Sequence, residues 1–291
     1  MTLERRAPVE DAEAATDDLK LWSVTTILKA IGSNDALIGW AANQTATAAI
    51  DDHETWQSRL EHEGRESAIK YLAGARYRRP DDELGATDLG TQFHTAAETL
   101  VLDGERPTDL HPQVAPLVAQ FEHWLDQFSP TIEAAELTIY HPAWGYAGTL
   151  DAIIELDGSR YVVDYKTSAV DLDSRGNPKR PWPTVALQLA AYRYARFAAA
   201  WRPRRFSKWS RRYYLLNETE KGTAQPIPEV DGGLCIYVTP ERCEAFAVRC
   251  GEQEMQFFGH ALQIARWEFQ ASKTAISKVP LVPPVREEAV V

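Results

Sequence analysis

The chain has 291 residues, of which 44% are hydrophobic and 25% charged, a composition typical of a folded globular protein. No apolar stretch is long enough to span a bilayer, and the charged N-terminus lacks the apolar segment of a secretion signal, so we expect a cytoplasmic protein without membrane contact. Three cysteines, Cys235, Cys243 and Cys250, fit no usual zinc spacing and are too few for an iron–sulfur cluster, so we expect structural thiols and no cluster.

The distribution of charge is uneven. The net charge of −11 argues by itself against nucleic acid as a partner. Residues 175–212, however, contain eleven of the 31 basic residues and none of the 42 acidic ones. Because the basic charge is concentrated in one region, a nucleic-acid partner is compatible with the acidic total.

The first part of the chain is predicted to be helical. Residues 1–20 are acidic and Ala-rich, and we expect a flexible leader. Residues 21–85 are predicted to form a helical lobe, since apolar residues follow Ser23 at helical spacing and Asn34 and Asp35 resemble a helix cap. A third helix is predicted over about 53–72.

Residues 86–272 are predicted to form a mixed α/β core. Two helical segments, near 89–102 and 113–128, precede a strand-rich block from 132 to 168. The Asp157–Gly158 pair within this block is typical of an antiparallel hairpin turn. A helix over 184–201, a further hairpin over 231–250 and a helix from about 252 to 270 follow. The Pro-rich residues 273–291 are predicted to be a disordered tail.

Three residues of the strand-rich block suggest metal chemistry. Asp164 and Lys166 are two apart on a predicted strand, so their side chains share one face. Asp151 ends the preceding strand, where its carboxylate can approach that of Asp164. Two converging carboxylates are the ligands that Mg²⁺ or Mn²⁺ requires, and a lysine beside them can stabilise charge on a phosphate. The structural alternative is a buried ion pair between Asp164 and Lys166.

The motifs around these residues strengthen the functional interpretation. GTLD, VVDYKTS and QLAAY, with the upstream GTQFHTAAE and the opening SVTTILKAIG, together resemble the RecB-type branch of the PD-(D/E)XK nuclease superfamily, in particular phage stand-alone exonucleases. The resemblance implies a restriction-endonuclease-like core, a mixed central sheet flanked by helices. The sequence departs from the CRISPR-associated members of this branch by lacking their four cysteines, and it contains no Walker A motif.

The resemblance also implies roles for individual residues. Asp151, Asp164 and the backbone carbonyl of Tyr165 would bind the metal, and Lys166 would be catalytic. His94 would bind the metal or contact the scissile phosphate, while Gln188 and Tyr192 would border the active centre. Two carboxylates have two interpretations each. Glu136 either approaches the metal or is a solvated strand-edge residue, and Glu98 either orients His94 or is solvated.

The basic region is predicted to bind DNA. In residues 201–214 six basic side chains alternate with aromatic ones, which can neutralise phosphates and stack on unpaired bases. The alternative is a solvated basic turn. The candidate contacts are Lys179, Arg180, Arg202, Arg204, Arg205, Lys208, Arg211 and Arg212.

The sequence therefore predicts a Mg²⁺- or Mn²⁺-dependent DNA nuclease, with an exonuclease of phage or bacterial recombination and repair as the preferred form. One alternative is a catalytically silent DNA-binding or partner-recruiting module of the same fold, and another is an interaction protein with a core ion pair. The Pro-rich tail could dock a recombinase, a helicase or a single-strand-binding protein. The sequence leaves the oligomeric state open.

Overall fold

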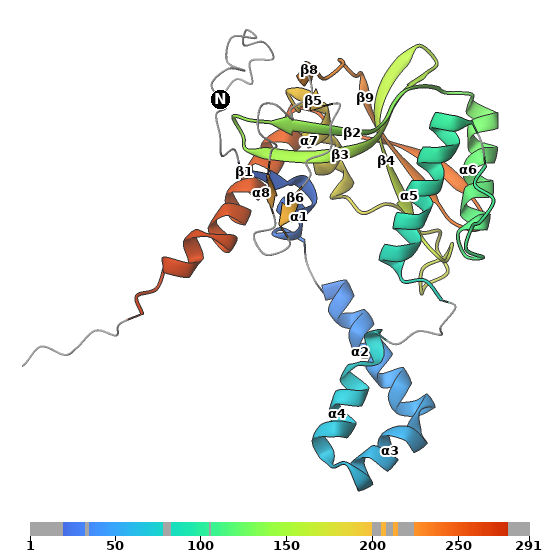
Figure 1. Cartoon of the computed structure of the whole chain (residues 1–291), viewed down its shortest axis with the longest axis vertical. Coiled ribbons are helices and arrows are strands. Elements are labelled where there is room, and N and C mark those ends of the chain that lie inside the picture. The colour runs from blue at the N-terminus through green and yellow to red at the C-terminus, as the bar shows by residue number, and fades with distance from the viewer. Residues whose placement is uncertain are drawn as a thin grey trace, which may run out of the picture.

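The computed structural model describes residues 20–32, 35–77, 83–104, 106–199, 205–207, 212–214 and 224–278. These form an α/β body and a helical arm that extends from it (Figure 1). The predicted leader, apart from its last residue, and the tail beyond residue 278 lie outside the described residues. No helix within the described part of the chain is long and apolar enough to cross a membrane.

A ten-stranded sheet of mixed direction forms the centre of the body. Its main path runs in the order β10-β9-β4-β3-β1-β7-β6, with β2, β5 and β8 continuing from the other edge of β3. The pairs β1–β3 and β4–β9 are parallel, and the others are antiparallel. The strands span β1 Lys20–Ser23, β2 Thr131–His141, β3 Tyr146–Leu156, β4 Ser159–Thr167, β5 Phe197–Ala199, β6 Arg205–Ser207, β7 Arg212–Tyr214, β8 Ala224–Pro226, β9 Gly232–Val238 and β10 Cys243–Val248.

Strand β3 pairs differently along its two edges. On one edge it pairs with β2 over almost its whole length. On the other it pairs with β1 through Tyr146 and Ala147 and with β4 only from Ala152 onward. Residues 148–151 thus face no paired strand on this edge, within the described part of the chain. The sheet therefore opens beside Asp151.

The predicted hairpin between β3 and β4 is confirmed. Leu156 pairs with Ser159, and the two residues between them, Asp157 and Gly158, have φ values of 51° and 76°. Two successive positive φ values define the tight turn whose twist matches antiparallel strands. This turn fixes the register that brings Asp151 and Asp164 to corresponding positions on neighbouring strands.

Helices cover both faces of the sheet. Helices α5 (Ala86–Asp103) and α6 (Ala115–Phe128) pack on one face, where Phe93 and Phe121 are fully buried. Helices α1 (Val24–Lys29), α7 (Val185–Arg193) and α8 (Glu252–Phe269) pack on the other. The architecture is the mixed sheet flanked by helices that the sequence predicted, and it is consistent with a restriction-endonuclease-like core.

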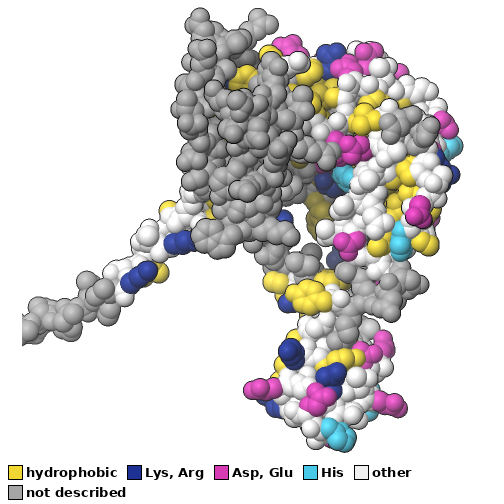
Figure 2. Space-filling model, in the orientation of Figure 1, with side chains coloured by type: hydrophobic (Ala, Val, Ile, Leu, Met, Phe, Trp, Pro, Cys, Tyr) yellow, Lys and Arg dark blue, Asp and Glu magenta, His cyan; other side chains and the backbone are white. Residues whose placement is uncertain are grey.

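The arm consists of α2 (Asp35–Asp51), α3 (His53–His62), α4 (Arg65–Ala73) and the short helix η2 (Ala75–Tyr77). Acidic and basic side chains are interspersed over its surface rather than separated by sign (Figure 2). The single helix predicted over 53–72 is wrong. Gly64, with φ of 91°, separates α3 from α4, because this backbone conformation interrupts a right-handed helix.

Further sequence expectations need correction. Residues 21–29, predicted to belong to a helical lobe, instead belong to the body, because β1 joins the sheet beside β3 and α1 packs against α7 and α8. Lys20, predicted as the end of the leader, is the first residue of β1. The helix predicted over 184–201 ends at Arg193, since Phe197–Ala199 instead forms β5 and pairs with β2.

Candidate active site

The opening between β3 and β4 positions the first carboxylate. Asp151 lies one residue before the point where the two strands begin to pair. Its Oδ2 accepts a hydrogen bond of 2.5 Å from the backbone N–H of Tyr165. The side chain of Asp151 thus satisfies a main-chain donor that is buried at the parting of the strands, and the bond fixes the orientation of the carboxylate.

The second carboxylate is held from two directions. Asp164 is 2% exposed, and its Oδ1 accepts a 2.6 Å hydrogen bond from the side-chain amide of Gln188 on α7. The same amide also donates to the hydroxyl of Tyr192, one turn later, at 2.9 Å. Lys166 Nζ lies 2.5 Å from Asp164 Oδ2. The structure therefore brings together the four predicted residues Asp164, Lys166, Gln188 and Tyr192.

These groups perturb each other's ionisation. Burial raises the pKa of Asp164 to about 6, and the nearby charge of Asp151 also raises it, against the opposing effect of the Lys166 ammonium. Burial lowers the pKa of Lys166, but the charge and hydrogen bond of Asp164 outweigh burial and raise that pKa overall. Lys166 therefore remains protonated at neutral pH. Two buried carboxylates share one ammonium, which leaves negative charge for a cation to neutralise.

Two further candidate metal ligands, His94 and Glu136, lie close to Asp151. His94 is on α5 and Glu136 is on β2. One possible ligand atom from each of them and one carboxylate oxygen of Asp151 all lie within 4.8 Å of one another. His94 Nδ1 is 3.2 Å from Asp151 Oδ1. Burial lowers the pKa of His94, but its hydrogen bond with Asp151 and that carboxylate's charge outweigh burial and raise the pKa overall.

The backbone of Glu136 is unusual for a strand. Its φ is 49°, in the left-handed region that non-glycine residues rarely adopt, and it lies opposite Asp151 in the β2–β3 register. Such a conformation costs on the order of 1 kcal/mol or more and persists where the surroundings or a function require it. The prediction that Glu136 approaches the metal site is therefore supported by its position beside His94 and Asp151.

The donor set fits a divalent cation. One imidazole and two carboxylates, from His94, Glu136 and Asp151, lie close enough together to share an ion and supply ligand types that Mg²⁺ and Mn²⁺ accept. Asp164 Oδ2 is buried and already lies against the Lys166 ammonium. A cation would therefore neutralise the negative charge that remains on Asp151 and Glu136.

The carboxylates of Asp151 and Glu136 open into a cavity of about 540 Å³. One wall is α5, which presents only small or polar side chains there, and the other includes Glu136, Asp151 and Lys166. The hydroxyls of Thr91 and Thr95 on α5 each donate to the backbone carbonyl one turn earlier. The residues lining the cavity are Ala86, Thr87, Gly90, Thr91, His94, Thr95, Glu98, Glu136, Asp151, Tyr165, Lys166 and Thr167.

Sequence reasoning missed the threonines of this wall. Their spacing of four along GATDLGTQFHTAAET was a signal in the sequence, because residues four apart share one helix face. Glu98, whose role the sequence left open, also lines the cavity.

Other predicted site residues lie apart from this centre or remain untested. The ring of Tyr165 packs against Phe93 and Phe121 in the core, so its predicted metal contact through the backbone carbonyl stays a prediction. Lys179 and Arg180 lie in the loop between β4 and α7. Arg202, Arg204, Lys208 and Arg211 lie outside the described residues, and for Arg205 and Arg212 only the backbone is described.

Comparison with known proteins gives a partial match. No protein-family model matches the chain. A stretch of 81 residues, 27% of the chain, is 36% identical to mitochondrial genome maintenance exonuclease 1 of Mus musculus and covers 23% of that protein. The chain thus spans about a quarter of the length of this curated relative. The crystal structure of SSO0001 aligns with 89% of this chain and 79% of its own, with a TM-score of 0.34 and 16% identity.

Proposed function

We propose that this chain is a metal-dependent DNA nuclease that hydrolyses phosphodiester bonds, and that it acts as an exonuclease. The observation that carries the proposal is the arrangement of charged side chains at one opening of the sheet. Asp151 and Lys166 line one cavity together with His94 and Glu136, and the buried Asp164 is ion-paired with Lys166 directly behind it. The partial match to a mitochondrial exonuclease supports the same reaction.

A purely structural ion pair explains this arrangement less well. A buried pair that serves only the fold needs its remaining oxygens and protons satisfied, because desolvating two charges is costly. Here Lys166 is 35% exposed toward the cavity while its partner is 2% exposed, and a second carboxylate, Asp151, adds negative charge nearby. The site thus retains an electrostatic imbalance that substrate and cofactor binding would relieve.

The residues have distinct roles in the proposed reaction. Asp151 and Asp164 would hold Mg²⁺ or Mn²⁺, with His94 and Glu136 as further ligands; the ion would supply positive charge to the scissile phosphate and make water in the site more acidic. Lys166, which stays protonated, donates a hydrogen bond to a phosphate oxygen and stabilises its developing negative charge. Gln188 keeps the Asp164 carboxylate oriented through its 2.6 Å hydrogen bond.

A cleavage assay with matched variants tests the proposal. Purified protein is incubated with end-labelled linear DNA and closed circular DNA, in Mg²⁺, in Mn²⁺ and in EDTA. We expect metal-dependent loss of linear DNA only, abolished in Lys166→Ala and Asp151→Asn. Asp157→Asn, an exposed residue of the β3–β4 turn, is the matched control and should cleave like the wild type.

Other outcomes change the conclusion. Cutting of closed circles would replace the exonuclease by an endonuclease. Failure of a well-folded wild type to cleave linear duplex, circles or single strands would contradict a stand-alone nuclease. Titration calorimetry with Mn²⁺ then separates the remaining classes, because a catalytically silent binding module that kept its carboxylates still binds the ion, and Asp151→Asn weakens that binding.

A further inference from the structure

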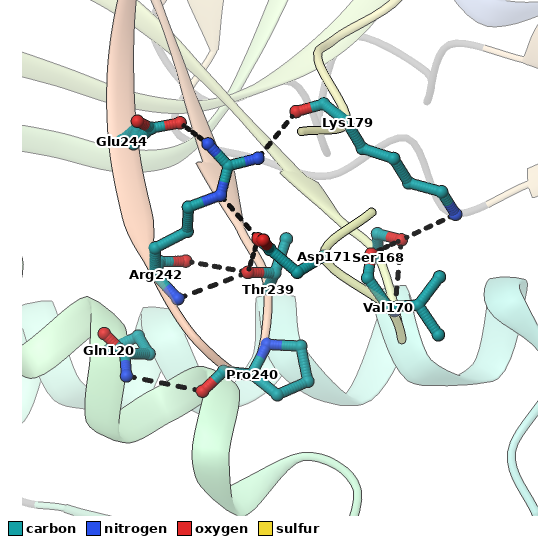
Figure 3. Close-up of polar contacts among 9 residues, drawn as sticks. All are labelled: Gln120, Ser168, Val170, Asp171, Lys179, Thr239, Pro240, Arg242 and Glu244. Atoms are coloured by element: carbon teal, nitrogen blue, oxygen red, sulfur yellow. Dashed lines mark hydrogen bonds and ion pairs between the residues drawn. The ribbon is translucent and has the colours of Figure 1, made fainter. Parts of the chain in front are cut away.

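The loop between β4 and α7, residues 168–184, is fixed in place by one arginine. Figure 3 shows the side chain of Arg242, from the turn after β9, directed at this loop. Its Nε lies 2.5 Å from Asp171 Oδ1, and its Nη2 donates to the carbonyl of Lys179 at 2.9 Å. Thr239 donates to the same Asp171 oxygen at 2.9 Å. We call residues 168–184 the clamped loop.

The clamped loop is also closed internally. The backbone N–H of Lys179 donates to the carbonyl of Asp171, and Lys179 Nζ donates to Ser168 Oγ at 3.2 Å. Asp173 accepts backbone hydrogen bonds from Arg175 and Asn177, so its charge is turned toward the loop itself. The loop therefore has a defined shape. The side chains of both its aspartates are engaged, Asp171 with Arg242 and Thr239 and Asp173 within the loop.

Both ends of the clamped loop adjoin the candidate active site. It begins directly after Thr167, which lines the cavity together with Lys166. It ends at α7, whose first turn carries Gln188, the partner of Asp164. Trp182 lies three residues before the first residue of α7 and six before Gln188. The loop is thus positioned to meet a polymer that extends out of the site.

The surface of this loop is both aromatic and basic. The side chain of Trp182 is 71% exposed although the loop that carries it is anchored, and Arg180, two residues earlier, is exposed as well. No acidic residue occurs between Asp173 and Trp182 in the sequence. Aromatic faces combined with cations are the features that bind unpaired nucleic-acid strands, in which bases are free to stack and phosphates need neutralising.

We propose that the clamped loop is a binding site for a single-stranded segment of nucleic acid, with Trp182 stacking on an unpaired base and Arg180 contacting a phosphate. Arg242 is the positioning residue that holds the loop for this contact. The proposal deepens the proposed nuclease function and rests on it for the identity of the substrate.

Binding measured without cleavage tests the stacking contact. Fluorescence anisotropy in EDTA follows a labelled 20-nucleotide oligo(dT). We expect Trp182→Ala to bind about 10-fold more weakly, the scale of one stacked base, and Trp182→Phe to recover most of the affinity. Trp267→Ala, which removes a tryptophan that is 59% exposed on α8, is the matched control and should bind normally.

A strand without bases provides the decisive comparison. On an oligomer of abasic residues, wild type and Trp182→Ala should bind equally, because the backbone remains but nothing can stack. Equal affinities on oligo(dT), or the same loss on the abasic strand, would overturn the proposal. If oligo(dT) binding depends on Trp182 but the protein cleaves no substrate, the nuclease function is refuted and this contact is not. If Trp182→Ala changes neither cleavage nor binding, this contact is refuted and the nuclease function is not.

The role of Arg242 is tested by comparing oligo(dT) binding by single and double variants of Arg242 and Trp182. Arg242→Lys keeps the charge but cannot bond Asp171 and the Lys179 carbonyl together. We expect oligo(dT) binding to weaken about as much as in Trp182→Ala, hydrogen exchange in residues 168–184 to accelerate, and the double variant to be no weaker than either single one. Additive losses would show that Arg242 acts elsewhere and would overturn its positioning role.

Discussion

Gly148 on β3 lies against the ring of Tyr192 on α7 so closely that a methyl group at position 148 would be 2.9 Å from Tyr192 Cε1. The same methyl would be 3.2 Å from a methyl of Val24. Tyr192 is 2% exposed and receives the hydrogen bond of Gln188, the residue that holds Asp164. The absence of a side chain at position 148 therefore determines how closely α7 approaches the carboxylates.

Gly148→Ala should consequently affect both stability and catalysis. We expect a loss of about 1–3 kcal/mol in the free energy of unfolding, since the buried ring must shift, together with reduced cleavage by the folded protein. Urea unfolding and the linear-DNA assay measure the two effects. In the control Gly39→Ala, where no atom lies within 4 Å of the added methyl, helix α2 should be stabilised. Wild-type stability and activity in Gly148→Ala would contradict this account.

Because the backbone of Glu136 is strained, replacing this residue by glycine should affect stability and activity in different ways. Glu136→Gly relieves the positive φ, so we expect the protein to be at least as stable as the wild type, by up to about 1 kcal/mol. Loss of the carboxylate beside His94 and Asp151 should lower metal-dependent cleavage by about 10-fold or more. Glu155→Gly, at an exposed position without positive φ on the neighbouring strand, should instead be destabilised by about 0.5–1 kcal/mol and stay active. A destabilised, fully active Glu136→Gly would show that the residue serves the fold.

The partly buried imidazole of His141 should make stability depend on pH. Burial, together with the charge of Arg196, lowers the pKa of His141 to about 4, and its Nδ1 accepts a hydrogen bond from the backbone N–H of Trp144. Between pH 6.5 and 4 the unfolded chain binds the proton more readily, so protonation favours unfolding and stability falls as the pH falls.

We expect this histidine to cost about 2 kcal/mol of stability at pH 5 relative to pH 7.5. His141→Gln, which cannot titrate in this range, isolates the effect from other ionisable groups. Urea unfolding at both pH values measures the free energy of unfolding of wild type and variant. Between pH 7.5 and pH 5, the wild type should lose about 2 kcal/mol more than the variant. If wild type and His141→Gln differ in the free energy of unfolding by the same amount at both pH values, the pKa of His141 is not lowered in the folded protein.

The Asp157–Gly158 turn should govern the alignment of the two strands that carry Asp151 and Asp164. Gly158 has φ of 76°, so Gly158→Val introduces a β-branched side chain into a conformation it strongly disfavours. We expect a loss of about 1–3 kcal/mol. Asp157→Asn should be tolerated, because asparagine adopts positive φ readily. Thermal unfolding of the two variants makes the comparison, and equal melting temperatures would contradict it.

The parts of the fold that the sequence predicted correctly depend on local patterns. Asp164 and Lys166 share a face because strand side chains alternate, and a two-residue turn is enough to bring Asp151 to them. The four-residue strand Lys20–Ser23 could not be foreseen in this way, because its partner in the sheet, Tyr146, lies more than 120 residues away. Likewise, the contact between Arg242 and Asp171 joins residues 71 apart in the sequence. The left-handed backbone of Glu136 leaves no mark in composition or spacing at all.

The threonine hydroxyls along α5 limit how a bound strand can be oriented. Thr91 and Thr95 each use their single proton within the helix, so they present only lone pairs to the cavity. Phosphate oxygens also accept hydrogen bonds and gain nothing from such a wall, whereas the ammonium of Lys166 attracts them. A nucleic-acid strand in this cavity would therefore turn its phosphates away from Thr91 and Thr95 and toward Lys166. These two threonines would thus favour one rotational setting of the polymer through their lone pairs, without a charge of their own.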